Sequence, residues 1–235
     1  ELQYITEISL KSPATMIPQA KNELRRMANM AQENLDHAIH GFLNQSNEFV
    51  DKVYHREEDI NNVSHAITDY LVKSNQLSLP LADQKILGSM FYVVNDIERI
   101  GDHAENFADY TKTEIKHNTG LTGDAKEEIK KMYTAVSKLL KLSLECFMEQ
   151  DGVNKPEDKL AEIAILEASI DKMERRYQKH HIKRLAKGEC EPRAGLLFSD
   201  MLSELERIAD HSVNIAYSMS DEDEDEILSA ENEAL

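Results

Sequence analysis

The sequence has few of the residues that favour sheets, disulfides and long loops. Its 235 residues include no Trp, two Cys, five Pro and eight Gly. Hydrophobic residues make up 41% and charged residues 30% of the chain, a balance that favours helices over sheets. The two cysteines, Cys146 and Cys190, follow no pattern and fit a reducing compartment such as the cytoplasm, although two cysteines could form one disulfide.

A long apolar run is also missing. No stretch approaches the roughly 18 apolar residues of a membrane span, and no signal peptide precedes the first expected helix. We therefore expect these residues to be soluble. Because the sequence begins at Glu1 rather than Met, we interpret it as a piece of a longer protein, whose membrane spans would leave no trace here.

Positive charge is scarce: the sequence has 27 Lys and Arg but 44 Asp and Glu, so its net charge is −17. A nucleic-acid binder normally presents a basic face, so we exclude nucleic acid as a partner and expect cations instead. Part of the charge lies in residues 220–235, which hold six consecutive acids without an apolar face. This pattern predicts a disordered, solubilising tail.

The first half of the chain has the apolar spacing of three helices. Apolar residues recur every three or four positions from Pro18 to about residue 50, again up to Ser74, and again after Pro80. We expect a lead-in over residues 1–15 and a first unit over residues 16–111.

The second half repeats this plan. A connection over residues 112–124, which contains two glycines, leads to a second unit over residues 125–219, with breaks at 152–156 and 188–192. The sequence therefore predicts an all-α fold of six long helices, built as two tandem three-helix bundles with pseudo-twofold symmetry, similar to spectrin repeats.

One string of residues occurs in both units. Glu-Arg-Ile-x-Asp-His-x-x-Asn begins at Glu98 and again at Glu206, 108 residues later. Upstream, Glu57 and Asn61 correspond to Glu167 and Asp171. Duplication followed by divergence explains both matches.

The two acids of each string lie one turn apart on the same helix face, away from the expected core. Like charges at this spacing repel, so an Arg of the motif or a bound cation should offset the repulsion. Clustered carboxylates suit hard or borderline metals. The simpler interpretation is a solvated helix face, but the repetition gives the metal hypothesis weight. His103 and His211 lie off this face, and we expect them to form hydrogen bonds between helices.

These residues resemble the PhoU family, whose third and sixth helices carry an acidic E/D-x-x-x-D signature. The likeness covers about residues 20–219 and includes the approach to the third helix at 77–88. The resemblance implies regulation of phosphate uptake and multinuclear sites for divalent or trivalent metal ions, with iron or zinc among the candidates. The implied metal ligands are Glu98, Asp102, Glu206, Asp210, Glu167 and Asp171. Asn61 in place of an acid should weaken the first site.

The opening residues 1–23 look more like the junction in bacterial sodium/phosphate cotransporters, where a PhoU-like domain follows the membrane segments. This implies a cytoplasmic regulatory domain, tethered to the inner membrane and acting on a transporter domain. The alternative is a free-standing PhoU-type negative regulator that acts on the phosphate ABC transporter and phosphate signalling.

Two other function classes are compatible with the sequence. Carboxylates in a bundle also suit a di-metal enzyme, but the motif helices lack the Glu-x-x-His ligands of ferritin-like proteins, so we expect no catalytic residues. A dimerisation module is the third hypothesis, and a homodimer is compatible with the metal hypothesis too. Oxygen ligands alone do not select among iron, zinc, manganese, magnesium and calcium.

Overall fold

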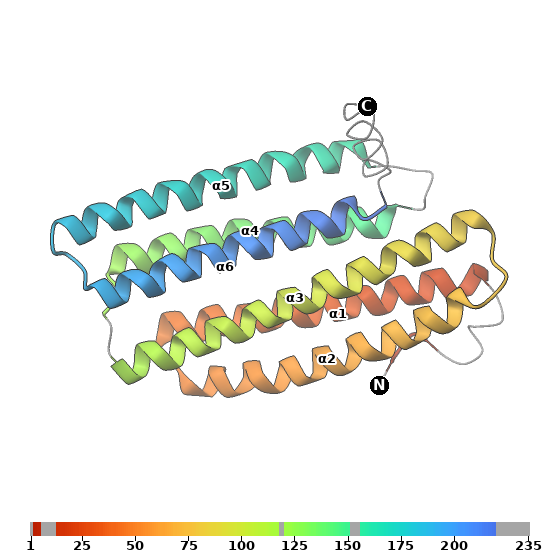
Figure 1. The fold of residues 1–235 in the computed structure, drawn as a ribbon, viewed down its shortest axis with the longest axis horizontal. Coiled ribbons are helices and arrows are strands. Elements are labelled where there is room, and N and C mark those ends of the chain that lie inside the picture. The colour runs from red at the N-terminus through yellow and green to blue at the C-terminus, as the bar shows by residue number, and fades with distance from the viewer. Residues whose placement is uncertain (1, 6–12, 118–119, 151–155, 220–235) are drawn as a thin grey trace, which may run out of the picture.

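The computed structural model describes residues 2–5, 13–117, 120–150 and 156–219. Within these ranges, helices joined by short loops make up the fold, with no strand. Figure 1 shows the six helices. They are α1 (Pro13–Asn44), α2 (Asn47–Asn75), α3 (Leu81–His117), α4 (Gly123–Glu149), α5 (Glu157–Ala186) and α6 (Pro192–Tyr217).

The helices form two three-helix units that pack side by side (Figure 1). Helices α1, α2 and α3 contact one another, as do α4, α5 and α6. The units meet where α3 packs against α6 and α1 against α4, while α2 and α5 lie at opposite outer edges. The predicted six-helix, two-unit fold is confirmed.

Apolar residues at helical spacing build the core. On α1, Leu24, Ala31 and Phe42 are fully buried, and so are Ile97 and Phe107 on α3. Each of these helices buries one continuous stripe, as the periodicity predicts. The inner helices α3 and α6 have many buried residues, because each packs against helices of its own unit and against the other unit.

Several expected helix ends were wrong. Helix α1 begins at Pro13 and includes Pro18. The carbonyl that Pro18 leaves without a partner belongs to Ala14, which is exposed, so water can satisfy it. The first helix stops at Asn44 rather than near residue 50, because Gln45 adopts a left-handed φ of 51°.

The expected connection over residues 112–124 was also too long. Helix α3 continues to His117, because Thr111 and Glu114 are buried and extend the same packed face. Helix α4 begins at Gly123, where the Thr122 hydroxyl accepts a hydrogen bond from the N–H of Ala125. The expected tail over residues 220–235 and most of the expected lead-in lie outside the described residues.

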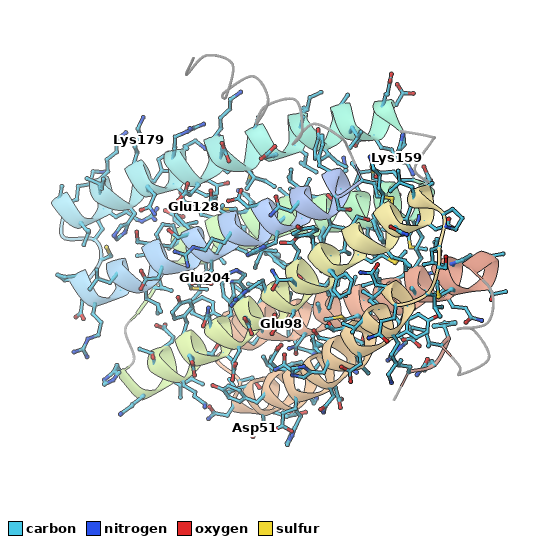
Figure 2. The ribbon with its side chains drawn as sticks, turned by 45° about the vertical axis from the view of Figure 1, so that its right-hand side comes forward. Asp51, Glu98, Glu128, Lys159, Lys179 and Glu204 are labelled. Carbon is cyan, nitrogen blue, oxygen red and sulfur yellow. The ribbon has the colours of Figure 1, made fainter. Side chains whose placement is uncertain are left out.

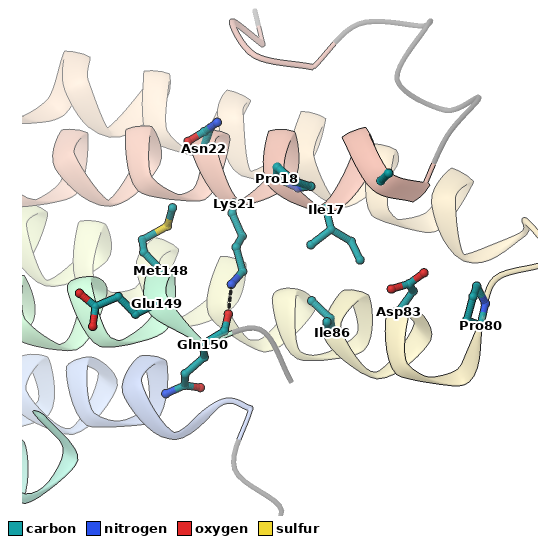
Figure 3. A pocket seen from close by; sticks show the side chains of 11 residues that line it. Ile17, Pro18, Lys21, Asn22, Pro80, Asp83, Ile86, Met148, Glu149 and Gln150 are labelled. Carbon is teal, nitrogen blue, oxygen red and sulfur yellow. Dashed lines mark hydrogen bonds between the residues drawn. The ribbon is translucent and has the colours of Figure 1, made fainter. Parts of the chain in front are cut away.

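A lysine joins the two units at the far end of α4. The Nζ atom of Lys21 on α1 donates to the carbonyl oxygens of Phe147 and Gln150, as Figure 3 shows for Gln150. A cation at the C-terminus of a helix is favoured, because the last carbonyls have no partner within the helix. No helix in the described part of the chain is long and apolar enough to cross a membrane. Cys146 and Cys190 are free thiols.

Candidate metal centres and the contact between repeats

The first acidic cluster lies where α2 meets α3. Glu98 and Asp102 of the motif are half-buried on α3, and Glu105 lies one turn further along the same helix. Across from them, α2 contributes Glu57, only 3% of whose surface is exposed. The structure therefore adds a buried acid to the predicted pair.

Glu57 is buried without a compensating partner. Neither of its carboxylate oxygens has a hydrogen-bond partner in the described part of the structure. Burial is the largest cause that raises its pKa, followed by the charges of Asp102, Glu105 and Glu98, and together they raise the pKa to about 8. Asn34 lowers the pKa of Glu57 but offsets only part of the increase. Its side chain also donates to the carbonyl of Val53.

A glycine makes room for this carboxylate. A Cβ atom built on Gly101 would lie 2.7 Å from Oε2 of Glu57, closer than non-bonded atoms approach. The same motif position in the second repeat is Ala209. The Glu57 carboxylate therefore lies against the backbone of α3 at Gly101, where a methyl group would push it aside.

The second acidic cluster lies where α5 meets α6. Burial raises the pKa of Glu206, and the charges of Asp210, Glu174 and Asp171 raise it further. Burial and the charges of Asp171 and Asp210 likewise raise the pKa of Glu167. Acids from two helices thus repel one another across this contact, and all four residues predicted for the second site lie along it.

Both clusters present carboxylate oxygens from two helices. Among the described residues, no group of three His, Cys, Asp or Glu converges closely enough to hold a metal ion. The donors are carboxylate oxygens, which suit hard and borderline cations. The unpartnered oxygens of Glu57 fit such an ion. Loading would require the side chains to move together, with the cation cancelling their repulsion.

The remaining motif residues hold the two repeats together. His103 on α3 contacts the carboxylate of Glu204 on α6, and Asn106 donates to the same carboxylate at 3.0 Å. Figure 2 shows Glu204 on α6 facing the layer that carries α3. Burial alone would raise the pKa of Glu204, but the hydrogen bonds from His103 and Asn106 outweigh it and lower the pKa.

The second repeat makes the same contact in return. Nδ1 of His211 lies 2.8 Å from the carboxylate of Asp96, and Asn214 donates to that carboxylate at 3.4 Å. The ring centroids of His103 and His211 lie 5.5 Å apart, so the two histidine–carboxylate pairs are neighbours. We call these two pairs the inter-repeat clamp. Its symmetry confirms the expected role of the histidines as bridges between helices.

The motif arginines pair with acids of their own helices. The Arg99 guanidinium lies 3.2 Å from Asp102, and the Arg207 guanidinium lies 4.0 Å from Glu204. Both arginine side chains are more than half exposed, so these pairs are weak. Arg99 thus offsets part of the charge of the first cluster at Asp102, whereas Arg207 pairs with Glu204, which lies outside the second cluster.

Sequence reasoning missed the two clamp acids. Asp96 and Glu204 are both buried and stand 108 residues apart, the offset of the motif itself. That offset could have revealed them. Glu105 was also missed, because its counterpart in the second repeat is Val213 and no repetition marks it.

A cleft of about 800 Å³ lies away from both acidic clusters. Ile17 and Lys21 of α1, Ile86 of α3 and Met148 of α4 line it (Figure 3). No residue of the two acidic clusters lines this cleft.

Comparisons with known proteins agree with this geometry. A family model described as the PhoU domain matches residues 24–111 and 129–219. The phosphate-specific transport system accessory protein PhoU homolog 1 of Thermotoga maritima is 22% identical over 196 residues, which cover 83% of this chain and 82% of that protein. The PhoU homolog of Synechocystis is 25% identical over 210 residues, with 87% and 88% coverage.

A solved structure matches as well. The crystal structure of PhoU from Pseudomonas aeruginosa superposes with a TM-score of 0.78 at 20% identity, and the match covers 88% of this chain and 97% of that chain. This likeness supports the fold alone, whereas the family model covers most of both three-helix units. The chain belongs to the PhoU domain family.

Proposed function

We propose that this chain is an accessory regulator of phosphate transport and not an enzyme. Its partners are proteins of a phosphate-specific transport system or of phosphate signalling. The match of the PhoU family model to both three-helix units carries the proposal. The relatives in Thermotoga maritima and Synechocystis are named as accessory proteins of phosphate-specific transport.

Between the two regulatory alternatives, the accessory protein has the better support. The matches run along 82% and 88% of the two relatives, so the chain corresponds to most of such a protein. The cotransporter domain rests only on residues 1–23. In the described part of this segment, the N–H groups of Gln3 and Tyr4 donate to Glu23 of α1, a contact that favours neither alternative.

The two acidic clusters are the proposed regulatory sites. A cation at the first site would be held by Glu98 and Asp102 with Glu57, and it would tie α2 to α3. A cation at the second site would tie α5 to α6 through acids of both helices, which are Glu167, Asp171, Glu206 and Asp210. Metal supply would then set how firmly each outer helix is held.

A cellular assay tests the function. The chain is expressed in a bacterium that lacks its own PhoU, and phosphate uptake and a phosphate-starvation reporter are measured. We expect the wild-type chain to restore repression and the Glu98→Ala/Asp102→Ala and Glu206→Ala/Asp210→Ala variants to lose most of it. A control, Glu58→Ala/Asp69→Ala, removes two exposed acids of α2 outside the cluster and should behave as wild type.

Two results would contradict the proposal. If the wild-type chain leaves uptake and reporter unchanged at normal expression, the regulatory role is wrong. If the chain restores repression and both motif variants do so equally well, the regulatory role stands but the acidic clusters do not carry it. Metal-dependent phosphatase or oxidase turnover of the purified chain would instead support the di-metal enzyme.

A further inference from the structure

The outer helix α5 carries a concentration of positive charge in an acidic protein. Residues 172–187 hold seven Lys and Arg and one acid, Glu174, although the whole chain has a net charge of −17. One of the seven, Arg184, is buried and pairs with Glu128 at 2.8 Å. The other six are exposed, and we call them the cationic ridge: Lys172, Arg175, Arg176, Lys179, Lys183 and Lys187.

The ridge runs along a single face of the helix. The buried residues of this half of α5 are Ile170, Tyr177, His181 and Arg184, which pack toward α4 and α6. At 100° per residue, the six cations all fall on the opposite side and extend over about 22 Å of helix axis. Figure 2 shows Lys179 pointing outward from this edge of the molecule.

Half of the ridge has no partner within the described part of the protein. Lys172, Lys179 and Lys183 form no ion pair there. Arg175 reaches Asp171 only at 4.0 Å, and Lys187 lies 3.5 Å from Glu189. A chain with 44 acids could easily neutralise three lysines. By charge complementarity, the unpaired lysines point to an anionic partner beyond the described residues.

Large apolar side chains are exposed at the same end. Ile182 lies between the cations and is 62% exposed, and Leu196, in the first turns of the adjoining α6, is 69% exposed. Both side chains could enter the interfacial region of a bilayer beside the bound headgroups.

We propose that the cationic ridge binds the surface of a bilayer that contains anionic phospholipid headgroups. Helix α5 forms an outer edge of the fold (Figure 1), so a flat surface can approach it without meeting another helix. Four of the six cations are Lys. A Lys ammonium is a point charge that suits the spread negative charge of a lipid surface, whereas Arg is favoured where two hydrogen bonds bind one carboxylate. These features favour lipid over an acidic protein.

The acidic body of the protein does not prevent this contact. Glu157 and Asp158, at the other end of α5, lie about 20 Å or more from Lys172 along the helix. Nearer acids of the same helix, Glu167 and Glu174, interact with Asp210 of α6, away from the ridge. Asp171 is offset in part by Arg175 at 4.0 Å. Charges are largely screened beyond about 8 Å at physiological ionic strength. The binding is therefore peripheral, reversible and sensitive to salt.

Vesicle sedimentation tests the proposal with the full chain. We expect the protein to sediment with vesicles of phosphatidylcholine and phosphatidylglycerol at low salt, to be released at high salt, and not to sediment with phosphatidylcholine alone. The variant Lys172→Glu/Lys179→Glu/Lys183→Glu should bind at least tenfold more weakly. Ile182→Gln should lower vesicle binding severalfold without changing the charge.

A matched control reverses three exposed lysines elsewhere, Lys73→Glu/Lys85→Glu/Lys116→Glu, and should bind within about twofold of wild type. Circular dichroism checks that every variant folds. Absence of wild-type binding to the anionic vesicles overturns the proposal, and so does an equal loss in the ridge variant and the control. Polyglutamate serves as a parallel probe. Binding to polyglutamate without binding to vesicles would assign the ridge to an acidic polypeptide and also overturn the proposal.

Discussion

Replacing Glu57 by Gln should stabilise the metal-free protein at neutral pH and leave it unchanged in acid. The side chain is 3% exposed, its oxygens lack partners in the described structure, and its pKa is raised from 4.5 to about 8. A group with a raised pKa supports the fold fully below its unfolded pKa, and that support is lost as the pH rises through the folded pKa. Gln has the same shape and no charge at any pH.

The size of the effect follows from this shift. Each pH unit between the unfolded and folded pKa costs about 1.4 kcal/mol, so the wild-type protein should lose about 3 kcal/mol relative to Glu57→Gln between pH 4.5 and pH 7. Above pH 8 the difference should stop growing. Titrating groups that do not interact with Glu57 are shared by the two proteins and cancel in the comparison, whereas Asp102, Glu105 and Glu98 are coupled to it and titrate with it.

Urea unfolding measures this difference. The free energy of unfolding is obtained by far-UV circular dichroism with a chelator present, at several pH values from about 5 to 8. Glu58→Gln, at the exposed neighbouring position on α2, is the control and should differ from wild type by a constant amount. A difference between Glu57→Gln and wild type that stays the same across this range would show that Glu57 is not held protonated, and the argument would be wrong.

Three further substitutions test the packing around the site and between the repeats. Gly101→Ala should gain less in urea unfolding than the about 1 kcal/mol that Ala brings to a helix over Gly, because its Cβ would displace the Glu57 carboxylate; the full gain should return when Glu57 is also Ala. Glu204→Ala should cost about 1–3 kcal/mol by leaving His103 and Asn106 unpaired at the clamp, whereas Asp200→Ala, exposed on the same helix, should change little. Lys21→Met should lower stability by about 1.5–3 kcal/mol through the lost hydrogen bonds to the end of α4. Its control is Lys130→Met at an exposed position of α4. If Glu204→Ala and Asp200→Ala, or Lys21→Met and Lys130→Met, have equal effects, the contact tested by that pair does not stabilise the fold.

The helices could be predicted because their apolar residues follow one period throughout. Leu24, Ala31 and Phe42 mark the buried stripe of α1 in the sequence as clearly as in the structure. The helix ends are harder to predict, because they depend on single residues. Gln45 takes a left-handed φ without the Gly that usually announces it, and α3 passes Lys112 because Glu114 is buried among neighbours that the sequence does not reveal.

The acidic pairs were predictable for a different reason. Two carboxylates one turn apart are unfavourable alone, so their recurrence at Glu98 and Glu206 stands out against a random helix. The burial of Glu57 was not predictable, since it depends on the packing of α2 against α3 over Gly101. The clamp acids share the 108-residue offset of the motif, but their histidine partners depend on the packing of α3 against α6.

Metal content is the most direct test of the two proposed sites. Protein is purified without chelator, and bound metal is counted by mass spectrometry in wild type, in each motif double variant and in Glu58→Ala/Asp69→Ala. We predict that Glu98→Ala/Asp102→Ala loses only the metal of the first site, that Glu206→Ala/Asp210→Ala loses only that of the second, and that the control keeps both. Equal metal content in wild type and both motif variants would contradict the account.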